Sequence, residues 1–521
     1  MKKKLLHIAL ATALLPVFTG CIGNFEEYNT NPYEPHKLDP PLLFTQMITT
    51  GINVQQNDNQ MIDQMVAGPY GGYLTMSTSW GGSNFNTYNQ TDGWNQIPFN
   101  TPFEKFYPNY YKVLDATGGK GHYFAMAKLL RVNAMQRVAL CYGPIPFSKM
   151  TQENSQVPYD CEPELYQNMF DDLNFAIAAL RDYLSESSLK PLGANDVVYG
   201  GDYAKWLRFA NSLKLRLALR IVNADEALAR KMAEEAVSDA GGLIDSPEYN
   251  AMVAVGVEPN PFWLVANSWG EIRANATLTS YMNGYNDPRM AAYFTPATID
   301  GEATFVGLRS GVKGMTSAIG APFSKPNFSQ GESMPMFFSS ETAFLRAEGA
   351  LRGWNMGGTA QELYEQGVTL SFTERGVSGV GKYLSDNTST PEDYTSPVES
   401  SRLSYQVQTE ITVAWEESAP FEEKLERIIT QKWIANFPLG FEAWSDYRRT
   451  GYPEIFPVVD NLSNGVISTS RQQRRLPFPL KEKQANSENV KAAVSMLGGS
   501  DTGATDLWWA TNQLYLLLHC K

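Results

Sequence analysis

The sequence is poor in the residues that most often build metal sites and disulfide frameworks. It has four histidines and four cysteines among 521 residues, and no two cysteines have the spacing CxxC. Structural zinc sites and disulfide frameworks rely on repeated short cysteine spacings, so the sequence indicates neither. Histidine catalysis would have to use His36, His122 or His519, and we expect each of these at the surface.

Positively charged residues and long hydrophobic runs after the N-terminal segment are also scarce. The formal net charge is −13, and removal of residues 1–20, which carry three lysines and no acid, makes it −16. Phosphate contacts need clustered Lys and Arg, so nucleic-acid binding is excluded. The run LYLLLH near the C-terminus is only six residues long, whereas a membrane-spanning helix needs about 20 apolar residues.

The N-terminus is where apolar residues do gather. After Met1 and three lysines, the stretch from Leu5 to Gly20 contains only one charge-capable side chain, His7. This is the layout of a secretory signal with a short apolar core. The tetrapeptide Phe18-Thr19-Gly20-Cys21 resembles a bacterial lipobox, in which the chain is cut before a lipid-bearing cysteine. We therefore expect residues 1–20 to be a lipoprotein signal peptide and Cys21 to be the anchor, the alternative being a buried or disulfide-bonded cysteine.

Residues after the expected cleavage point favour the outer membrane. The second residue of the expected mature chain is Ile22, whereas an inner-membrane retention signal has Asp at this position. Glu26 and Glu27 lie where surface-exposed lipoproteins of Bacteroidetes-like bacteria carry acidic residues. We expect a lipid-anchored protein on the outer membrane that faces outward from the cell surface.

Helical patterns dominate the rest of the chain. Asp39-Pro40 predicts a helix start, followed by an apolar stripe through Leu42, Leu43, Met47 and Ile48. The aromatic side chains between residues 103 and 114 also have helical spacing, although Pro108 is expected to kink or delay that helix. Further amphipathic stretches cover residues 122–140 and 162–184, and helix returns at residues 421–437.

Two helical hairpins predict the scaffold. Asp202 caps residues 203–222, and after a tight turn a second helix runs through residues 226–244. Residues 341–355 and 359–376 repeat this design. Each pair takes about 35 residues, close to the tetratricopeptide (TPR) period of about 34. The sequence therefore predicts a mostly α-helical, TPR-like scaffold.

Two other regions lack this periodicity. Residues 245–335 are rich in Gly, Pro, Asn and aromatics, which predicts a long loop excursion with a few short strands. Residues 385–419 are rich in Ser, Thr, Pro and acids, which predicts a solvated loop.

The motifs that suggest an enzyme are weak. Residues 376–382, GVSGVGK, have the spacing of a phosphate-binding loop, but Tyr383 replaces the Ser or Thr that would hold magnesium and a helix precedes them. They are better explained as a Gly-rich helix exit. A glycosidase needs two facing carboxylates, whereas Glu162, Glu164, Asp171 and Asp172 are expected to complement the N-terminus of one helix or to face solvent. The loop with Asp386, Glu392 and Asp393 could hold a hard cation but lacks the Gly and Glu of an EF-hand, so we expect no metal site.

Aromatic residues give the most specific hint of function. Twelve of them lie within the 42 residues from Tyr70 to Tyr111. Sugar rings present apolar faces and hydroxyl edges, so aromatic platforms beside amide and carboxylate side chains suit them. The loop-like part of this segment and the later excursion supply the candidate ligand-binding residues, with packing of the loop onto the scaffold as the alternative: Trp80, Tyr88 and Trp94, and less strongly Trp263, Trp269 and Tyr285.

Several blocks in order resemble the SusD/RagB family of nutrient-binding lipoproteins, in particular its SusD-like branch. They are GDYAKWLRFANSLKLRLALRI, AFLRAEGALRGWN, IITQKWIANFPLGFEAWSDYRRTGYP, RRLPFPLKEKQANSENV and TDLWW. The resemblance extends from Cys21 to about Asn512 and implies one helical, TPR-containing domain, residues 21–512. The last residues, 513–521, are an atypical C-terminal extension.

The resemblance also implies a function and a partner. Members bind glycans or other nutrients, peptides included, and lie as a lid over a SusC-like TonB-dependent transporter. We therefore expect a non-enzymatic surface protein without cofactor that captures a nutrient, most simply an oligosaccharide, and delivers it to such a transporter. The alternatives are a surface glycoside hydrolase on an α-helical frame and an adhesin or structural surface protein.

Overall fold

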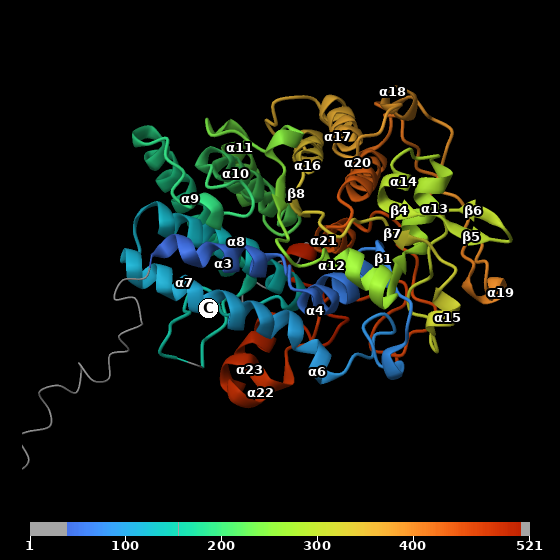
Figure 1. The fold of residues 1–521 in the computed structure, drawn as a ribbon, viewed down its shortest axis with the longest axis horizontal. Coiled ribbons are helices and arrows are strands. Elements are labelled where there is room, and N and C mark those ends of the chain that lie inside the picture. The colour runs from blue at the N-terminus through green and yellow to red at the C-terminus, as the bar shows by residue number, and fades with distance from the viewer. Residues whose placement is uncertain (1–38, 155, 512–521) are drawn as a thin grey trace, which may run out of the picture.

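The computed structural model describes residues 39–154 and 156–511, and helices make up most of its regular structure (Figure 1). The expected signal peptide, Cys21 and the extension 513–521 lie outside the described residues. The longer helices are α3 (Phe44–Gly51), α7 (Ile97–Thr117), α8 (Gly121–Tyr142), α9 (Glu162–Glu186), α10 (Tyr203–Arg220), α11 (Glu226–Ser238), α13 (Ala276–Gly284), α16 (Ser339–Leu351), α17 (Ala360–Glu374), α20 (Phe421–Ala435), α21 (Gly440–Thr450) and α23 (Ser487–Met496).

The predicted helical hairpins are confirmed. Helix α10 packs on α11 and α16 packs on α17, while α9, α10, α16 and α20 follow one another as neighbours. Side-chain caps define the starts of these helices: Asp202 accepts from the N–H groups of Ala204 and Lys205, and Asp225 accepts from that of Leu228. Such caps satisfy N–H groups that have no partner inside the helix. The result is the stacked helix-pair architecture expected of a TPR-like fold.

One detail of the predicted helices was wrong. Leu42 was expected on the apolar stripe but is 62% exposed, because Pro40–Leu43 form a 3₁₀ turn ahead of α3. Helix α7 begins at Ile97 and contains both Pro102 and Pro108, so Pro108 does not delay its start.

The excursion contains most of the short strands, as predicted, and β1 comes from the preceding part of the chain. The strands pair as four two-stranded sheets: β1 (Leu74–Met76) with β3 (Ile272–Ala274), β2 (Ala251–Val253) with β8 (Met334–Phe337), β4 (Phe294–Thr295) with β7 (Lys325–Pro326), and β5 (Ala297–Ile299) with β6 (Glu302–Thr304). The pairing of β1 with β3 is antiparallel and brings the aromatic loop after β1 to the middle of the excursion. It thereby joins two regions that the sequence analysis treated separately.

Helix α18 (Val380–Leu384) settles the interpretation of GVSGVGK. Gly376 and Gly379 have φ of 65° and 93°, left-handed values that favour glycine. They connect the end of α17 to the five-residue α18. The segment is a helix exit, as expected.

The acids on α9 fall into two classes. Glu164 and Asp171 are exposed, as expected, but Glu162 and Asp172 are buried, so the expectation of a solvated face was wrong for these two. Asp172 forms ion pairs with Lys128 and Arg131. Ten residues of helix separate Glu162 from Asp172, about 15 Å, and the paired Asp172 is not free to act on a substrate.

Glu162 makes stability depend on pH. Burial raises its pKa to about 7, and the Trp508 N–H that donates to its Oε2 at 3.0 Å opposes this only in part. The raised folded-state pKa favours the neutral form, so its contribution is present below the unfolded value near 4.5 and is lost as the pH rises through 7. We expect the melting temperature of Glu162→Gln to fall less than that of the wild-type protein when the pH is raised from 5 to 8. Parallel pH profiles of the two proteins would contradict this.

Both described cysteines are buried. Cys141, on α8, is a free thiol whose burial raises its pKa to about 12, so it is not reactive at neutral pH. Cys161 is the residue before α9. Within residues 39–154 and 156–511, no helix combines the length and apolar character needed to cross a membrane.

Candidate ligand-binding surface

Three segments that are distant in sequence meet around the start of the aromatic loop. The Ser77 N–H donates to the Glu271 carbonyl at 2.9 Å, and the Ser77 hydroxyl donates to the Gly270 carbonyl at 2.7 Å. The Ser79 N–H donates to the Met315 carbonyl at 3.0 Å. We call residues 77–95, 263–271 and 313–320 together the three-loop surface. The sequence analysis missed its third segment, which has no aromatic residue and no recognisable motif.

Trp80 sits on this surface in an unusual backbone conformation. Its φ is 48°, and Gly81 and Gly82 follow with φ of 76° and 93°. A left-handed conformation at a bulky residue costs about 1–3 kcal/mol and persists only where the surroundings hold it. The half-buried indole also has an Nε1–H with no acceptor among the described residues. The backbone of Trp80 is therefore strained, and its indole N–H has no acceptor among the described residues.

Trp94 supports Trp80. The two rings are in edge contact, with centroids 5.7 Å apart, and Trp94 also stacks on the buried Phe85 at 6.1 Å. Thr91 caps the short helix α6 (Asp92–Asn95) by accepting from the Trp94 N–H. Trp94 thus links the exposed part of the loop to the core.

The amide side chains of this loop mainly hold the loop itself. Asn84 Nδ2 donates to the Ser79 carbonyl at 3.2 Å, and Asn89 Nδ2 donates to the Gly82 carbonyl at 2.9 Å. Asn84 is buried. The Asn-rich composition that suggested ligand hydrogen bonds is therefore used in part to fix the loop on both sides of Trp80.

Trp269 is the most accessible of the predicted aromatic residues. It ends the π-helical η6 (Leu264–Trp269) and is 40% exposed, and Gly270 with φ of 73° turns the chain back into β3. Trp263, on the short α12 (Pro261–Trp263), is half-buried and packs against the main core. Of these two, Trp269 has a face available to a ligand.

Tyr88 and Tyr285 lie in the core. They are 5% and 2% exposed, and burial raises the pKa of each hydroxyl. Tyr88 packs against Tyr70, and the Tyr285 hydroxyl donates to the Ile411 carbonyl at 2.9 Å. The structure does not place either ring where a ligand reaches it, so we leave both out of the proposed contact set.

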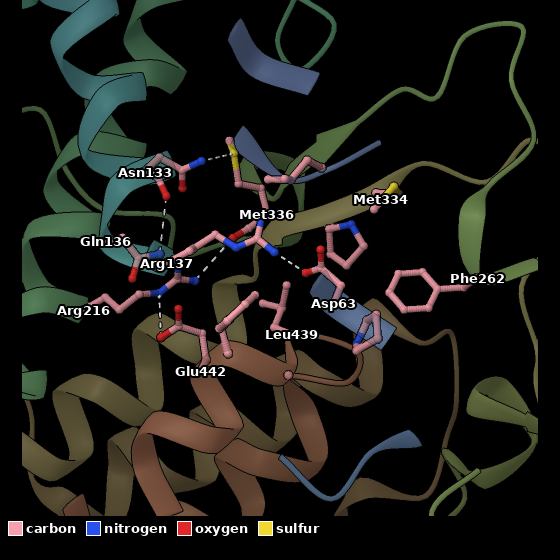
Figure 2. A pocket seen from close by; sticks show the side chains of 15 residues that line it. Asp63, Asn133, Gln136, Arg137, Arg216, Phe262, Met334, Met336, Leu439 and Glu442 are labelled. Atoms are coloured by element: carbon pink, nitrogen blue, oxygen red, sulfur yellow. Dashed lines mark hydrogen bonds and ion pairs between the residues drawn. The ribbon is translucent and has the colours of Figure 1, made fainter. Parts of the chain in front are cut away.

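A pocket of about 50 Å³ between η2 (Gln60–Ala67), α8, β8 and the start of α21 is a second candidate (Figure 2). Its charges are already used: Arg137 pairs with Asp63, and Arg216 lies 3.6 Å from Glu442. The phenylalanines that line it are buried by protein. A site for a polar ligand needs polar groups that converge on it and remain available, so we favour the three-loop surface.

The acidic loop contains no cation cage. Asp386 accepts from the N–H groups of Ser389 and Thr388, which lower its pKa to about 2, and Asp393 accepts from the Val407 N–H. Their oxygens thus organise the chain locally. The structured part of the chain shows no group of three His, Cys, Asp or Glu residues placed to hold a metal ion.

Comparisons with known proteins agree with this architecture. Residues 28–510 match the family described as SusD-like, Susd and RagB outer membrane lipoprotein. A SusD-like protein from Bacteroides thetaiotaomicron VPI-5482 is 41% identical, with a TM-score of 0.87 over 91% of this chain and 99% of its own. A SusD homolog from Bacteroides uniformis ATCC 8492 is 39% identical, with a TM-score of 0.86 over 91% and 100%. A chitin-binding SusD homolog from Flavobacterium johnsoniae is 38% identical, with a TM-score of 0.87 over 91% and 99%. A comparison with curated proteins finds no match.

Proposed function

Since the chain belongs to the SusD-like family of Susd and RagB outer membrane lipoproteins, we propose that it captures an extracellular oligosaccharide on the three-loop surface. We further propose that it delivers this ligand, without chemical change, to a SusC-like TonB-dependent transporter at the cell surface. A related protein of the same fold is described as chitin-binding, which supports a glycan over a peptide as the ligand.

Trp80 and Trp269 carry the proposal. They lie on segments joined by the Ser77–Gly270 hydrogen bond, and Trp269 is 40% exposed. An exposed indole on a rigid frame can cover the apolar face of a sugar ring, and the half-buried Trp80 indole can add apolar surface on the joined segment. Trp94 and Trp263 are proposed to support these rings rather than to be the main contacts.

Trp269→Ala should weaken oligosaccharide binding several-fold to tenfold, because an aromatic contact is worth about 0.5–1.5 kcal/mol beyond its buried area. The melting temperature should barely change, since the side chain is partly exposed. Calorimetric titration beside melting curves measures both. Phe421→Ala is the matched control: Phe421 is 39% exposed and begins α20, and its loss should leave affinity unchanged. Equal affinities for all three proteins would remove Trp269 from the site.

The runner-up function, a surface glycoside hydrolase, makes the opposite prediction about turnover. We expect the purified protein, incubated for hours with a glycan that it binds, to release no new reducing ends. The three-loop surface carries two acids, Asp92 and Glu271, and Gln60 donates to Glu271 at 2.5 Å. Turnover that a single carboxylate variant abolishes would place the hydrolase first.

A further inference from the structure

Arg273, on β3 beneath the three-loop surface, is a buried cation without a carboxylate. It is 4% exposed. Its Nη1 donates to the carbonyls of Gly270 and Ile272 at 3.0 and 2.7 Å, while its buried Nε has no acceptor among the described residues. None of the ion pairs in the described part of the chain includes it. A buried charge is costly unless it is paired, so this guanidinium lacks the partner that its position calls for.

Other buried arginines show how this protein normally compensates such a charge. Most pair with carboxylates: Arg216 with Glu341, Arg289 with Asp287, and Arg449 with Glu348. Two that do not pair with a carboxylate use other groups. Arg448 lies over the rings of Trp444 and Trp509 and donates to three carbonyls, and Arg309 lies over Tyr405 and Phe456 and also donates to three carbonyls. Arg273 has two carbonyl acceptors and no ring contact of this kind in the described residues.

A second unpaired cation lies beside it. Lys325, on β7, is half-buried, and β7 contacts both β3 and η6. Burial lowers the pKa of Lys325, and the positive charge of Arg273 lowers it further. Within residues 39–154 and 156–511, the Lys325 ammonium makes no hydrogen bond or ion pair. Two adjacent like charges without a counterion are unusual in a chain whose net charge is −13.

The nearest acid in sequence does not neutralise them. Glu271 accepts from Gln60 Nε2 at 2.5 Å, and burial raises its pKa while this hydrogen bond opposes the shift. A neighbouring Arg⁺ or Lys⁺ would lower that pKa, but none contributes. The Arg273 guanidinium therefore lies at the Gly270 turn, next to Trp269, and Lys325 lies on β7, which contacts both β3 and η6.

We propose that the ligand of the three-loop surface carries an anionic group, a carboxylate or a sulfate, and that Lys325 together with Arg273 receives it beside the Trp269 ring. This inference rests on the proposed function of the surface and specifies the ligand as an acidic oligosaccharide. Trp269 covers an apolar sugar face, Lys325 contacts the acid group, and Arg273 supports the Gly270 turn while adding its charge. Charge-assisted hydrogen bonds are about twice as strong as neutral ones, so the acid group would contribute much of the selectivity.

Matched pairs of probes test the ligand class. Oligogalacturonate and its methyl ester differ in the carboxylate charge and one methyl group per esterified sugar. Sulfated and unsulfated chondroitin oligosaccharides differ in the sulfate. We expect the more anionic member of at least one pair to bind about tenfold more tightly, and Lys325→Met, which keeps the aliphatic stem, to abolish that preference. Lys481→Met, on the exposed face of α22 (Leu480–Ala485), is the control and should retain it.

A ligand-free measurement keeps this inference separate from the proposed function. Trp269 is the most exposed tryptophan of the described residues, so anionic iodide and neutral acrylamide should both quench its fluorescence. Lys325→Met should reduce quenching by iodide and leave quenching by acrylamide unchanged. Unchanged iodide quenching, or equal binding of both members of every pair that binds, overturns the anionic ligand. If no oligosaccharide of any kind binds while iodide still distinguishes the variants, the cation site stands and the glycan function fails.

Discussion

Arg289→Met should destabilise the protein by roughly 3–5 kcal/mol, the usual cost of leaving one member of a buried ion pair without its partner. Arg289 is fully buried between α13 and α14 (Met290–Tyr293) and binds Asp287 through both Nε and Nη2, at 2.9 and 2.6 Å. The guanidinium also donates to Ser371 on α17 and Gln431 on α20. It therefore connects the loop excursion, which contains residues 263–271 and 313–320 of the three-loop surface, to the helical scaffold.

The double variant Asp287→Asn/Arg289→Met distinguishes loss of the charge pair from loss of side-chain packing as the cause of the destabilisation. Removing both charges should recover part of the stability, because the asparagine leaves no unpaired buried carboxylate. Denaturant unfolding of the single and double variants measures this. If the double variant is less stable than Arg289→Met by the full destabilisation that Asp287→Asn causes alone, the charge pair is not the source of the effect.

Interactions local in sequence explain why the scaffold could be predicted. Asp202, Asp225 and the Thr359–Glu362 capping box all act within four residues of their helix starts, and such signals can be read from a single chain. The 3₁₀ turn that exposes Leu42 shows the limit of this reasoning. The periodicity there is correct, but the turn type changes which face the residue presents.

The three-loop surface could be predicted only in part. Its aromatic composition drew attention to Trp80, Trp94, Trp263 and Trp269, but the same reasoning selected Tyr88, which is buried against Tyr70. An aromatic residue in a loop suits either burial or ligand contact, and composition does not separate them. What separates them is the path of the backbone between distant segments, here fixed by hydrogen bonds from Ser77 and Ser79.

The unpaired charges were beyond sequence analysis for a related reason. Arg273 and Lys325 are 52 positions apart and belong to different sheets. Whether a cation is compensated depends on which acid lies near it in space, and Glu271, only two residues away from Arg273, bonds to Gln60 instead. Sequence proximity alone would have suggested a salt bridge at this place.

Membrane attachment is expected to depend entirely on Cys21. Burial of each acyl CH₂ contributes about 0.8 kcal/mol, so one chain gives reversible binding whereas two or three chains on one residue hold a soluble domain firmly. The family to which the chain belongs is described as outer membrane lipoproteins. Cys21 lies outside the described residues, and its role rests on the sequence around it.

Cys21→Ala should therefore yield a folded protein that no longer incorporates a labelled fatty acid and that moves from the membrane fraction to the soluble fraction. Its melting curve should match that of the wild-type domain, because the substitution changes none of the described core residues. Lys481→Met is a suitable control, since it changes a charge without touching the signal and should remain in the membrane fraction. A transporter embedded in the membrane could retain the unlipidated protein, so the fatty-acid label has to be measured together with fractionation. Loss of label with retained sedimentation would indicate binding to the transporter. Retained label would show that Cys21 is not the lipidated residue.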